Sequence, residues 1–389
     1  MEVVEVFIVG AGPSGLATAA CLNKFSIPYV IVEREDCIAS LWHKHTYDRL
    51  KLHIAKEFCE LPHMSYPDDA PTYIPKDQFM RYVDDYVEHF NIVPTFNAST
   101  ESCMYDEEKK YWAISAHDKV NNKMLEYAAK FLVVATGENS ASNIPEIIGL
   151  PSFPGETMHS SSYKSGNDYA GKSVLVVGSG NSGFEIAYDL AVHGAKTSII
   201  IRNPMHVMKK EMIHLGMVLA KWHIPLKFVD FVLIVLAYFL FGDLSKYGIV
   251  RPFLGPLLLK AKTGRSAVID VGTTELIKKG DIKVLDSISR IRGKLIEFKD
   301  GKKRYYDTIV FATGYKSTVN MWLKSDVSMI NSDGMPKNDF PNHWKGANGL
   351  YCVGLARRGL AGIANDAGVV ANDIHDVIEM VRDEVKIQL

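Results

Sequence analysis

Two glycine fingerprints constrain the fold of this 389-residue chain more than any other feature. GAGPSG at 10–15 follows the apolar run VEVFIVG, GSGNSG at 178–183 follows SVLVVG, and each opens a helix-like segment. In such a turn the first glycine allows the bend, the second lets the backbone approach a pyrophosphate, and the third lets the helix pack on the strand. Two copies predict an α/β chain with two Rossmann-like dinucleotide-binding domains, and therefore an electron-transfer enzyme. The candidate contacts are Gly10, Gly12 and Gly15 at the first site, and Gly178, Gly180, Asn181, Ser182 and Gly183 at the second.

The strands that follow the fingerprints distinguish the two ligands. Glu33 ends PYVIVE about 20 residues past the first motif, where a carboxylate accepts hydrogen bonds from the adenosine ribose hydroxyls. It would repel a 2′-phosphate, so this site suits FAD or NAD. Arg202 ends KTSIIIR after the second motif, where a cation pairs with the 2′-phosphate of NADPH; a solvated strand end is the alternative. We therefore assign FAD to the first site and NADPH to the second.

A second repeat predicts how the two domains are threaded. KFLVVATG and DTIVFATGY are apolar runs typical of buried parallel strands, and each ends in Ala-Thr-Gly, which lets the chain leave the sheet beside a dinucleotide. We expect an NADPH domain at 166–304 inserted into a split FAD domain at 1–165 and 305–389. The first Ala-Thr-Gly motif adds Thr136 and Gly137 to the candidate FAD site. The second Ala-Thr-Gly motif consists of Ala312, Thr313 and Gly314 and is followed by Tyr315.

Three further segments complete the expected organisation. Residues 106–127 read as a strand meander within the FAD domain, and a strand at 350–354 leads into a long C-terminal helix. The positive N-terminal end of that helix would stabilise negative charge on the flavin pyrimidine. Residues 209–264 form a mostly helical insertion that shapes a substrate entrance or only covers the sheet. Its uncharged run, Phe231–Phe241, is shorter than the ~20 residues of a membrane span; a buried helix is expected, with peripheral membrane contact as the alternative.

Composition excludes several classes of protein. A net charge of −1 gives no chain-wide footprint for nucleic acid or an anionic membrane. The five cysteines form no C-x-x-C pair, which argues against a disulfide framework and against a flavin disulfide reductase. No metal is expected. Because strand-like sequence begins at Val3, we expect no targeting peptide and a cytoplasmic protein, with the cytosolic face of the endoplasmic reticulum as an alternative site.

The linker before the second fingerprint is specific. FPGETMHSSSY fits F-x-G-x-x-x-H-x-x-x-Y through Phe153, Gly155, His159 and Tyr163. With FATGY at 311–315, it resembles the class B flavin-dependent monooxygenases, in which this linker joins the FAD and NADPH domains and couples the nicotinamide position to the flavin. A purely structural hydrogen bond from His159 is compatible with that role.

A narrower resemblance covers nearly the whole chain and is to the plant YUCCA family. It implies oxidative decarboxylation of indole-3-pyruvate to indole-3-acetate, the auxin, by O2, FAD and NADPH through an oxygen adduct at flavin C4a. It also places Trp42 in the FAD site and His53 beside the flavin, as a candidate catalytic residue where animal-type enzymes have asparagine. The segments that carry it are SLWHKHTYDRLKLHIAKEFCELP (40–62), VVATGEN (133–139), YKSGNDYAGKSVLVVGSGNSG (163–183), IDVGT (269–273), FATGYKS (311–317) and NHWKG (342–346).

Other interpretations stay open at this point. An N- or S-oxygenating flavin monooxygenase acting on a soft nucleophile is the nearer alternative, followed by a non-oxygenating NADPH-dependent reductase and a binding protein without turnover. A keto-acid carboxylate needs a cation, for which Arg49, Lys51, Arg357 and Arg358 are candidates. The alternative for each is a solvated surface charge or, for Arg49, a pyrophosphate contact.

Overall fold

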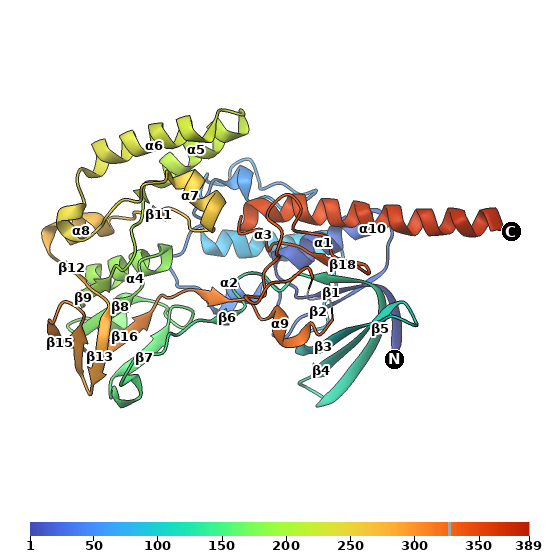
Figure 1. Cartoon of the computed structure of the whole chain (residues 1–389), viewed down its shortest axis with the longest axis horizontal. Coiled ribbons are helices and arrows are strands. Elements are labelled where there is room, and N and C mark those ends of the chain that lie inside the picture. Colours follow the sequence, from blue (N-terminus) through green and yellow to red (C-terminus); the bar gives the residue numbers. More distant parts are fainter. Residues whose placement is uncertain (326–327, 389) are drawn as a thin grey trace. The chain divides into compact units, whose positions relative to one another are not determined.

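The computed structural model describes residues 1–325 and 328–388, and its contacts divide the chain into two units (Figure 1). The first unit comprises Met1–Lys44, Ala55–Ala141 and Tyr315–Leu389. The second comprises His45–Ile54 and Ser142–Gly314. The second unit is thus inserted into the first at two places along the chain.

These boundaries differ from the expected ones at 165 and 305. Residues 142–165 and 305–314 belong to the second unit, because β7 (Glu156–His159) and β16 (Thr308–Phe311) are neighbours in its sheet. The second Ala-Thr-Gly motif therefore follows a strand of the inserted unit, just as the first motif follows a strand of the other unit. Segment 45–54 also lies in the second unit, although it is expected in the FAD domain.

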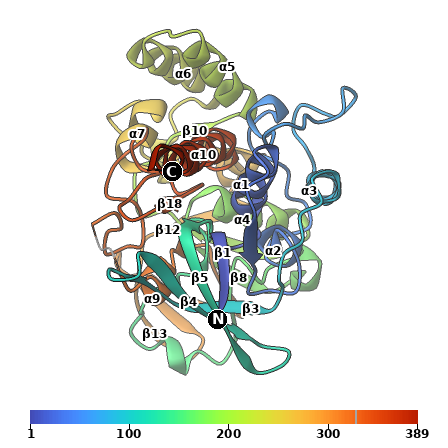
Figure 2. The ribbon, with the colours of Figure 1, turned by 90° about the vertical axis from the view of Figure 1, so that its right-hand side faces the viewer.

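The first unit is built on a sheet of order β2-β1-β5-β4-β3, with β18 also paired to β5 (Figure 2). The long strand β5 is antiparallel to β4 and parallel to β1 and β18, so the expected meander leads directly into the parallel core. Helix α1 packs against the C-terminal helix α10. The elements are β1 (Glu2–Val9), α1 (Pro13–Lys24), β2 (Tyr29–Val32), α2 (Ser40–Lys44), α3 (Lys76–His89), β3 (Ala98–Asp106), β4 (Tyr111–Asp118), β5 (Lys123–Val134), α9 (Val319–Trp322), β18 (Leu350–Cys352) and α10 (Leu360–Gln388), with short strands β6 (Ala141–Ser142) and β17 (Tyr315–Lys316) at the unit boundary.

The second unit is built on a parallel sheet of order β12-β9-β8-β16-β7. A small antiparallel sheet of order β13-β14-β15 and a β10-β11 pair accompany it. The expected insertion is helical and consists of α5, α6 and α7. The remaining elements are β8 (Ser173–Val177), α4 (Asn181–Val192), β9 (Lys196–Ile200), β10 (Val207–Met208), α5 (Lys210–Lys221), α6 (Leu226–Phe241), α7 (Pro256–Thr263), β11 (Val268–Ile269), α8 (Thr273–Lys279), β12 (Ile282–Leu285), β13 (Ile288–Arg292), β14 (Leu295–Phe298) and β15 (Lys303–Tyr305), with 3-10 turns at Leu150–Ser152, Gly166–Tyr169 and Ser245–Tyr247 in this unit and Lys56–Phe58 in the other.

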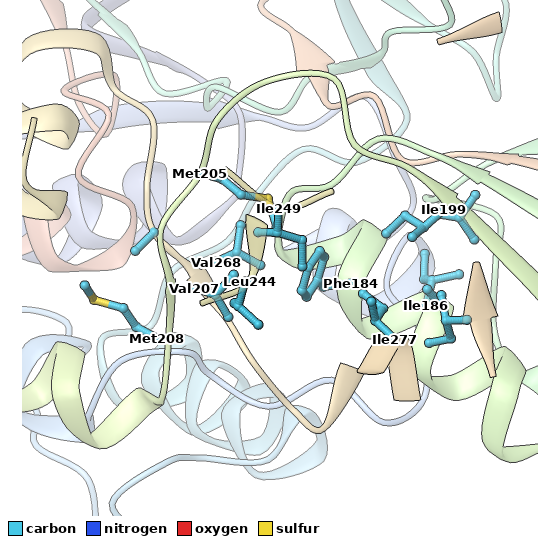
Figure 3. Close-up of a cluster of buried hydrophobic side chains, with 14 of the residues drawn as sticks. Phe184, Ile186, Ile199, Met205, Val207, Met208, Leu244, Ile249, Val268 and Ile277 are labelled. Carbon is cyan, nitrogen blue, oxygen red and sulfur yellow. The ribbon is translucent and has the colours of Figure 1, made fainter. Parts of the chain in front are cut away.

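The apolar side of helix α4 packs into the core of the second unit (Figure 3). Phe184 and Ile186 of α4 are fully buried among Ile199 of β9 and Ile277 of α8. Side chains beside and within the insertion complete the same cluster; they are Met205, Val207, Met208, Leu244, Ile249 and Val268. This packing holds the second fingerprint, which opens α4, in a fixed place on the sheet.

Candidate functional site

The first fingerprint contains two kinds of glycine. Two of its glycines are required by the packing of the fold, and the remaining one leaves open space beside the backbone. Gly10 has φ +104°, and a Cβ there would lie 2.8 Å from the Ala135 carbonyl oxygen. A Cβ at Gly15 would overlap the Gly10 carbonyl oxygen. Gly12, at the N-cap of α1, has φ −76°, and no other group lies within 4 Å of the position that a Cβ would take. The open space above Gly12 is where a pyrophosphate would approach the backbone.

The second fingerprint repeats this arrangement. Gly178 has φ +115°, and a Cβ there would overlap the Ala312 carbonyl oxygen; a Cβ at Gly183 would overlap that of Gly178. A Cβ at Gly180 would again have nothing within 4 Å. Ala135 and Ala312 begin the two Ala-Thr-Gly ends, so each return strand contacts the first glycine of its own unit. Both motifs thus belong to one structural repeat, present once in each unit.

Helices α1 and α4 both begin with N–H groups that could bind an anion. Gly12 and Gly180 cap α1 and α4 without a side-chain hydrogen bond, and neither first turn contains an acidic residue. The N–H groups at the start of a helix and its positive dipole end favour a phosphate there. The geometry of both units therefore fits a dinucleotide pyrophosphate.

Glu33 lies immediately after β2 and closes onto the first fingerprint. Its carboxylate is 7% exposed and accepts hydrogen bonds from the backbone N–H groups of Ala11 at 2.9 Å and Glu35 at 3.1 Å. Burial raises the pKa of Glu33, while these two hydrogen bonds act in the opposite direction. The structure thus places the expected ribose-binding acid beside the loop that would hold the pyrophosphate.

The two Ala-Thr-Gly ends differ in one hydroxyl. In the second unit, Thr313 donates its hydroxyl hydrogen bond to the Asn143 carbonyl oxygen. In the first unit, Thr136 Oγ1 is buried and has no hydrogen-bond partner in the part of the chain that the structure describes. Gly137 follows with open space above it. Because buried hydroxyls almost always find a partner, Thr136 fits a site completed by a bound molecule.

Trp42, which is expected in the FAD site, lies in α2 of the first unit. Its side chain is half-buried, and its ring packs against Phe79 of α3 with centroids 4.5 Å apart. This contact holds α2 against α3 within that unit.

The expected NADPH residues divide into two groups. Arg202 is exposed two residues beyond β9, available to a ligand. Asn181 and Ser182 instead have partners within the protein: Asn181 Oδ1 accepts from the Ile269 N–H at 2.8 Å, and Ser182 hydrogen-bonds Tyr47. These two side chains therefore help to hold β11 and segment 45–54 against α4.

Arg202→Ala is expected to lower the preference for NADPH over NADH. A charge-assisted hydrogen bond contributes about 1.5–3 kcal/mol, which corresponds to a roughly tenfold to hundredfold loss in the ratio of the two kcat/KM values. The measurement is NADPH and NADH oxidation by both proteins. Arg292→Ala, an exposed arginine of the same unit, is the control, and an unchanged ratio in Arg202→Ala would remove Arg202 from the 2′-phosphate site.

The linker motif forms the edge of the second unit's sheet. Phe153 is buried in a cluster with Ile309 and Phe311, and a Cβ at Gly155 would overlap the Asp307 carbonyl oxygen. Strand β7 then runs parallel to β16, with His159 opposite Phe311. The close approach at Gly155 explains why the motif needs glycine there.

His159 joins this linker to the FATGY motif. Its ring is 5% exposed, with Nε2 2.9 Å from the Gly314 carbonyl oxygen and Nδ1 2.9 Å from Ser161 Oγ. Burial lowers the pKa of His159, and the carbonyl opposes that shift. The partners suit a neutral ring that donates from Nε2, since the Ser161 N–H points at Nδ1. His159 is therefore a positioning residue between the two motifs.

Acidification is expected to destabilise the second unit through His159. Its folded pKa lies below the ordinary value of 6.5, so the unfolded chain binds the proton more readily. Stability is then full above about pH 6.5 and is lost as the pH falls through that value towards the folded pKa. Thermal unfolding between about pH 8 and 5 should show a shallower fall for His159→Gln than for the parent chain. Equal slopes would contradict this contribution.

A polar face on α4 is the feature that sequence reasoning missed. Ser182, Glu185 and Asp189 share one face at i, i+3 and i+7, and both acids are buried, at 6% and 5% exposed. Tyr47 donates its hydroxyl hydrogen bond to Glu185 Oε2 at 2.5 Å, and His53 Nε2 lies 3.3 Å from the same oxygen. The signal was present as two acids in an otherwise apolar helix, because buried carboxylates need partners.

Asp189 completes this face. It accepts from the Tyr163 hydroxyl at 2.6 Å and from the Gly166 N–H at 2.8 Å. Arg49 Nη1 lies 3.6 Å from its other oxygen, and the guanidinium stacks 4.5 Å over the Tyr188 ring. The last residue of the linker motif and segment 45–54 thus converge on one carboxylate.

These contacts involve two of the expected site residues. His53, expected beside the flavin, lies in the second unit with Glu185 of α4 as its partner. Arg49, a candidate for binding a substrate carboxylate, is already paired with Asp189. Of the other candidates, Lys51 and Arg357 are exposed, and exposed Arg358 stacks 4.1 Å from the Phe340 ring centroid.

A buried pair in the first unit was also missed. His343 Nε2 lies 3.1 Å from Asp366 Oδ2 on α10, and both side chains are at most 2% exposed. The same oxygen accepts from the Gly354 N–H at 3.1 Å, and a Cβ at Gly354 would overlap Ser14 Oγ on α1. The pair therefore anchors the start of α10 near the start of α1.

Comparison with known proteins assigns the family. Residues 7–215 match the pyridine nucleotide-disulphide oxidoreductases. A probable indole-3-pyruvate monooxygenase of Arabidopsis thaliana, YUCCA10, is 51% identical over 98% of this chain and 100% of its own length. The chain belongs to the YUCCA family. A second YUCCA relative, the indole-3-pyruvate monooxygenase YUCCA6 of the same plant, is 46% identical over 95% of this chain and 89% of its own. The predicted family and the monooxygenase class are confirmed.

Solved structures confirm the fold of this YUCCA protein. The flavin-containing monooxygenase of Stenotrophomonas maltophilia superposes with a TM-score of 0.73 at 17% identity, covering 97% of this chain and all of that one. OTEMO, solved in complex with FAD and NADP, gives 0.74 at 15% identity over 98% of this chain and 85% of its own. The α/β prediction with one dinucleotide-binding domain inserted into another therefore holds.

Proposed function

We propose that this YUCCA protein oxidatively decarboxylates indole-3-pyruvate to indole-3-acetate, a step of auxin biosynthesis, using FAD, NADPH and O2. In the balanced reaction, indole-3-pyruvate, O2, NADPH and a proton give indole-3-acetate, CO2, NADP⁺ and water. One oxygen atom enters the new carboxylate and the other leaves as water. The proposal is carried by the 51% and 46% identity, over nearly the full length of this chain, to relatives whose names state this activity.

We propose that the first unit is the FAD domain and that the second unit binds NADPH. The open space at Gly12, the unpaired hydroxyl of Thr136 and the buried Glu33 support FAD. The open space at Gly180 and the exposed Arg202 support NADPH. Bound together, these cofactors would supply hydride transfer and O2 activation.

The chain's own residues would position these groups and hold charge. His159 fixes the FATGY loop to the linker, so it controls the loop beside the NADPH fingerprint without needing to transfer a proton. The N-terminus of α10, whose first turn contains no acid, would stabilise negative charge on the flavin pyrimidine. With Arg49 paired, Lys51, Arg357 and Arg358 remain for the keto-acid carboxylate.

We further propose a cytoplasmic protein that can work at the cytosolic face of the endoplasmic reticulum. No helix in residues 1–325 and 328–388 is both long and apolar enough to cross a bilayer. We propose that contact with the membrane at that face is peripheral.

The test is turnover of indole-3-pyruvate with NADPH under ¹⁸O2, with catalase present. Catalase matters because free peroxide decarboxylates 2-keto acids without an enzyme. We expect indole-3-acetate carrying one ¹⁸O atom, with NADPH consumed in equal amount. Product that disappears with catalase would indicate a peroxide-producing oxidase. Oxygenation of an amine or a thioether without turnover of the keto acid would establish the N- or S-oxygenating alternative.

A further inference from the structure

Helix α6 is attached to the second unit by a narrow stripe. Val229, Leu233, Ala237 and Phe241 recur every four residues and are at most 5% exposed. They face the core, and α6 packs against both α5 and α7 (Figure 1). The stripe accounts for one side of the helix, and a surface helix would normally be polar on the other.

The outer side of α6 is apolar instead. Four large side chains on that side are more than half exposed: Phe228 at 58%, Phe231 at 63%, Tyr238 at 58% and Phe239 at 81%. Leu240, near the C-terminal end of α6, is exposed at 59%. Exposed apolar side chains on the adjoining loops enlarge the set; they are Trp222 at 69%, Val250 at 52% and Phe253 at 102%. We call these eight residues the α6 face. A concentration of this kind marks an interaction surface rather than ordinary scattered exposure.

The single acid of α6 is withdrawn from that face. Asp230 is 3% exposed, and its two oxygens accept the N–H groups of Leu257 at 2.8 Å and Leu258 at 3.1 Å, at the start of α7. Its charge is therefore used to cap a neighbouring helix. The other charged residue of α6, Lys227, is exposed.

The surrounding segment is strongly basic. Residues 209–265 contain nine lysines and arginines against three acids, a net charge of +6 in a chain of −1. Lys221, Lys227, Lys246 and Lys262 are all exposed. The chain-wide charge conceals this local excess, so composition alone missed it.

We propose that the α6 face docks on the surface of an anionic lipid bilayer. Aromatic and aliphatic side chains would enter the boundary between headgroups and acyl chains, and the flanking lysines would meet the negative headgroups. At 16 residues α6 is about 24 Å long and lies in the membrane plane. A second copy is the poorer occupant, because two segments of +6 would repel each other. The inference rests on the proposed peripheral location and is independent of the proposed reaction.

The experiment is flotation of the full chain with vesicles of phosphatidylcholine alone or with about one-third phosphatidylserine. We expect binding to the anionic vesicles, with a blue shift of tryptophan emission that Trp222→Phe removes. Phe231→Glu with Phe239→Glu should lower the partition coefficient by about tenfold or more. Val93→Glu with Val120→Glu, at side chains 83% and 71% exposed in the first unit, should not. Lys221→Gln with Lys227→Gln should weaken binding to anionic vesicles only.

Two results would overturn the inference. One is failure of the parent chain to float with either vesicle, a measurement that needs no variant. The other is a dimer by light scattering that the double phenylalanine variant converts to monomer, which would identify the α6 face as a contact between copies. Neither result depends on turnover of indole-3-pyruvate, so neither bears on the proposed reaction.

Discussion

The Gly12→Ala variant is expected to fold as the parent chain does and to purify with little flavin. Gly12 has a φ of −76°, which any residue adopts, and nothing lies within 4 Å of the added methyl group. Neither the backbone conformation nor the packing of the protein therefore requires glycine at position 12. The reason for glycine is the ligand, because a methyl group would occupy the space that a pyrophosphate needs. The flavin content should fall by at least about tenfold, equal to about 1.4 kcal/mol of binding free energy.

The controls separate this loss from misfolding. Gly368→Ala, at an open position inside α10, should keep the flavin. Gly15→Ala should instead lower the Tm of the flavin-free protein, since its methyl group would overlap the Gly10 carbonyl oxygen. Flavin absorbance per protein and thermal unfolding of the stripped proteins measure both effects. Full flavin content in Gly12→Ala would remove the first fingerprint from the FAD site. Gly180→Ala should keep flavin and lose its reduction by NADPH.

The local parts of the fold could be predicted from the sequence because their causes are local. A glycine turn between a strand and a helix requires three glycines at fixed spacing, so both dinucleotide folds were visible. Glu33 was expected at a strand end and lies there, buried against Ala11. The mostly helical character of the insertion was also predicted, and Gly or Pro marks both ends of α6 and α7.

What escaped prediction depends on pairing between distant segments. The boundary at Ser142 follows from β7 pairing with β16, which are about 150 residues apart in sequence. Segment 45–54 belongs to the second unit because Tyr47 and Arg49 meet acids on α4. Nothing in the segment itself indicates which unit holds those acids. The outer side of α6 was likewise hidden, because a helix with apolar residues on all sides does not reveal which side is buried.

The Glu185→Leu variant is expected to release segment 45–54 from the second unit. Leucine is close in size to glutamate but cannot accept the hydroxyl of Tyr47, which is 5% exposed and has its pKa raised by burial and by the carboxylate beside it. A hydrogen bond to a charged acceptor contributes about 1.5–3 kcal/mol, and this one is lost while the contact of Tyr47 with Ser182 remains. The loss should appear as a lower Tm and as faster tryptic cleavage at Arg49 and Lys51.

Three companion variants make the cause identifiable. Glu185→Gln keeps an acceptor oxygen and should stay close to the parent chain. Tyr47→Phe removes the donor, so adding it to Glu185→Leu should cost less than the sum of the two single changes. Glu275→Leu, at an exposed pair with Lys279, should change little because surface ion pairs contribute little. If Glu185→Leu and Glu275→Leu behave alike, the α4 face does not anchor the segment. If only Glu185→Leu exposes the segment, the buried acids of α4 explain why residues 45–54, distant in sequence from the second fingerprint, fold with it.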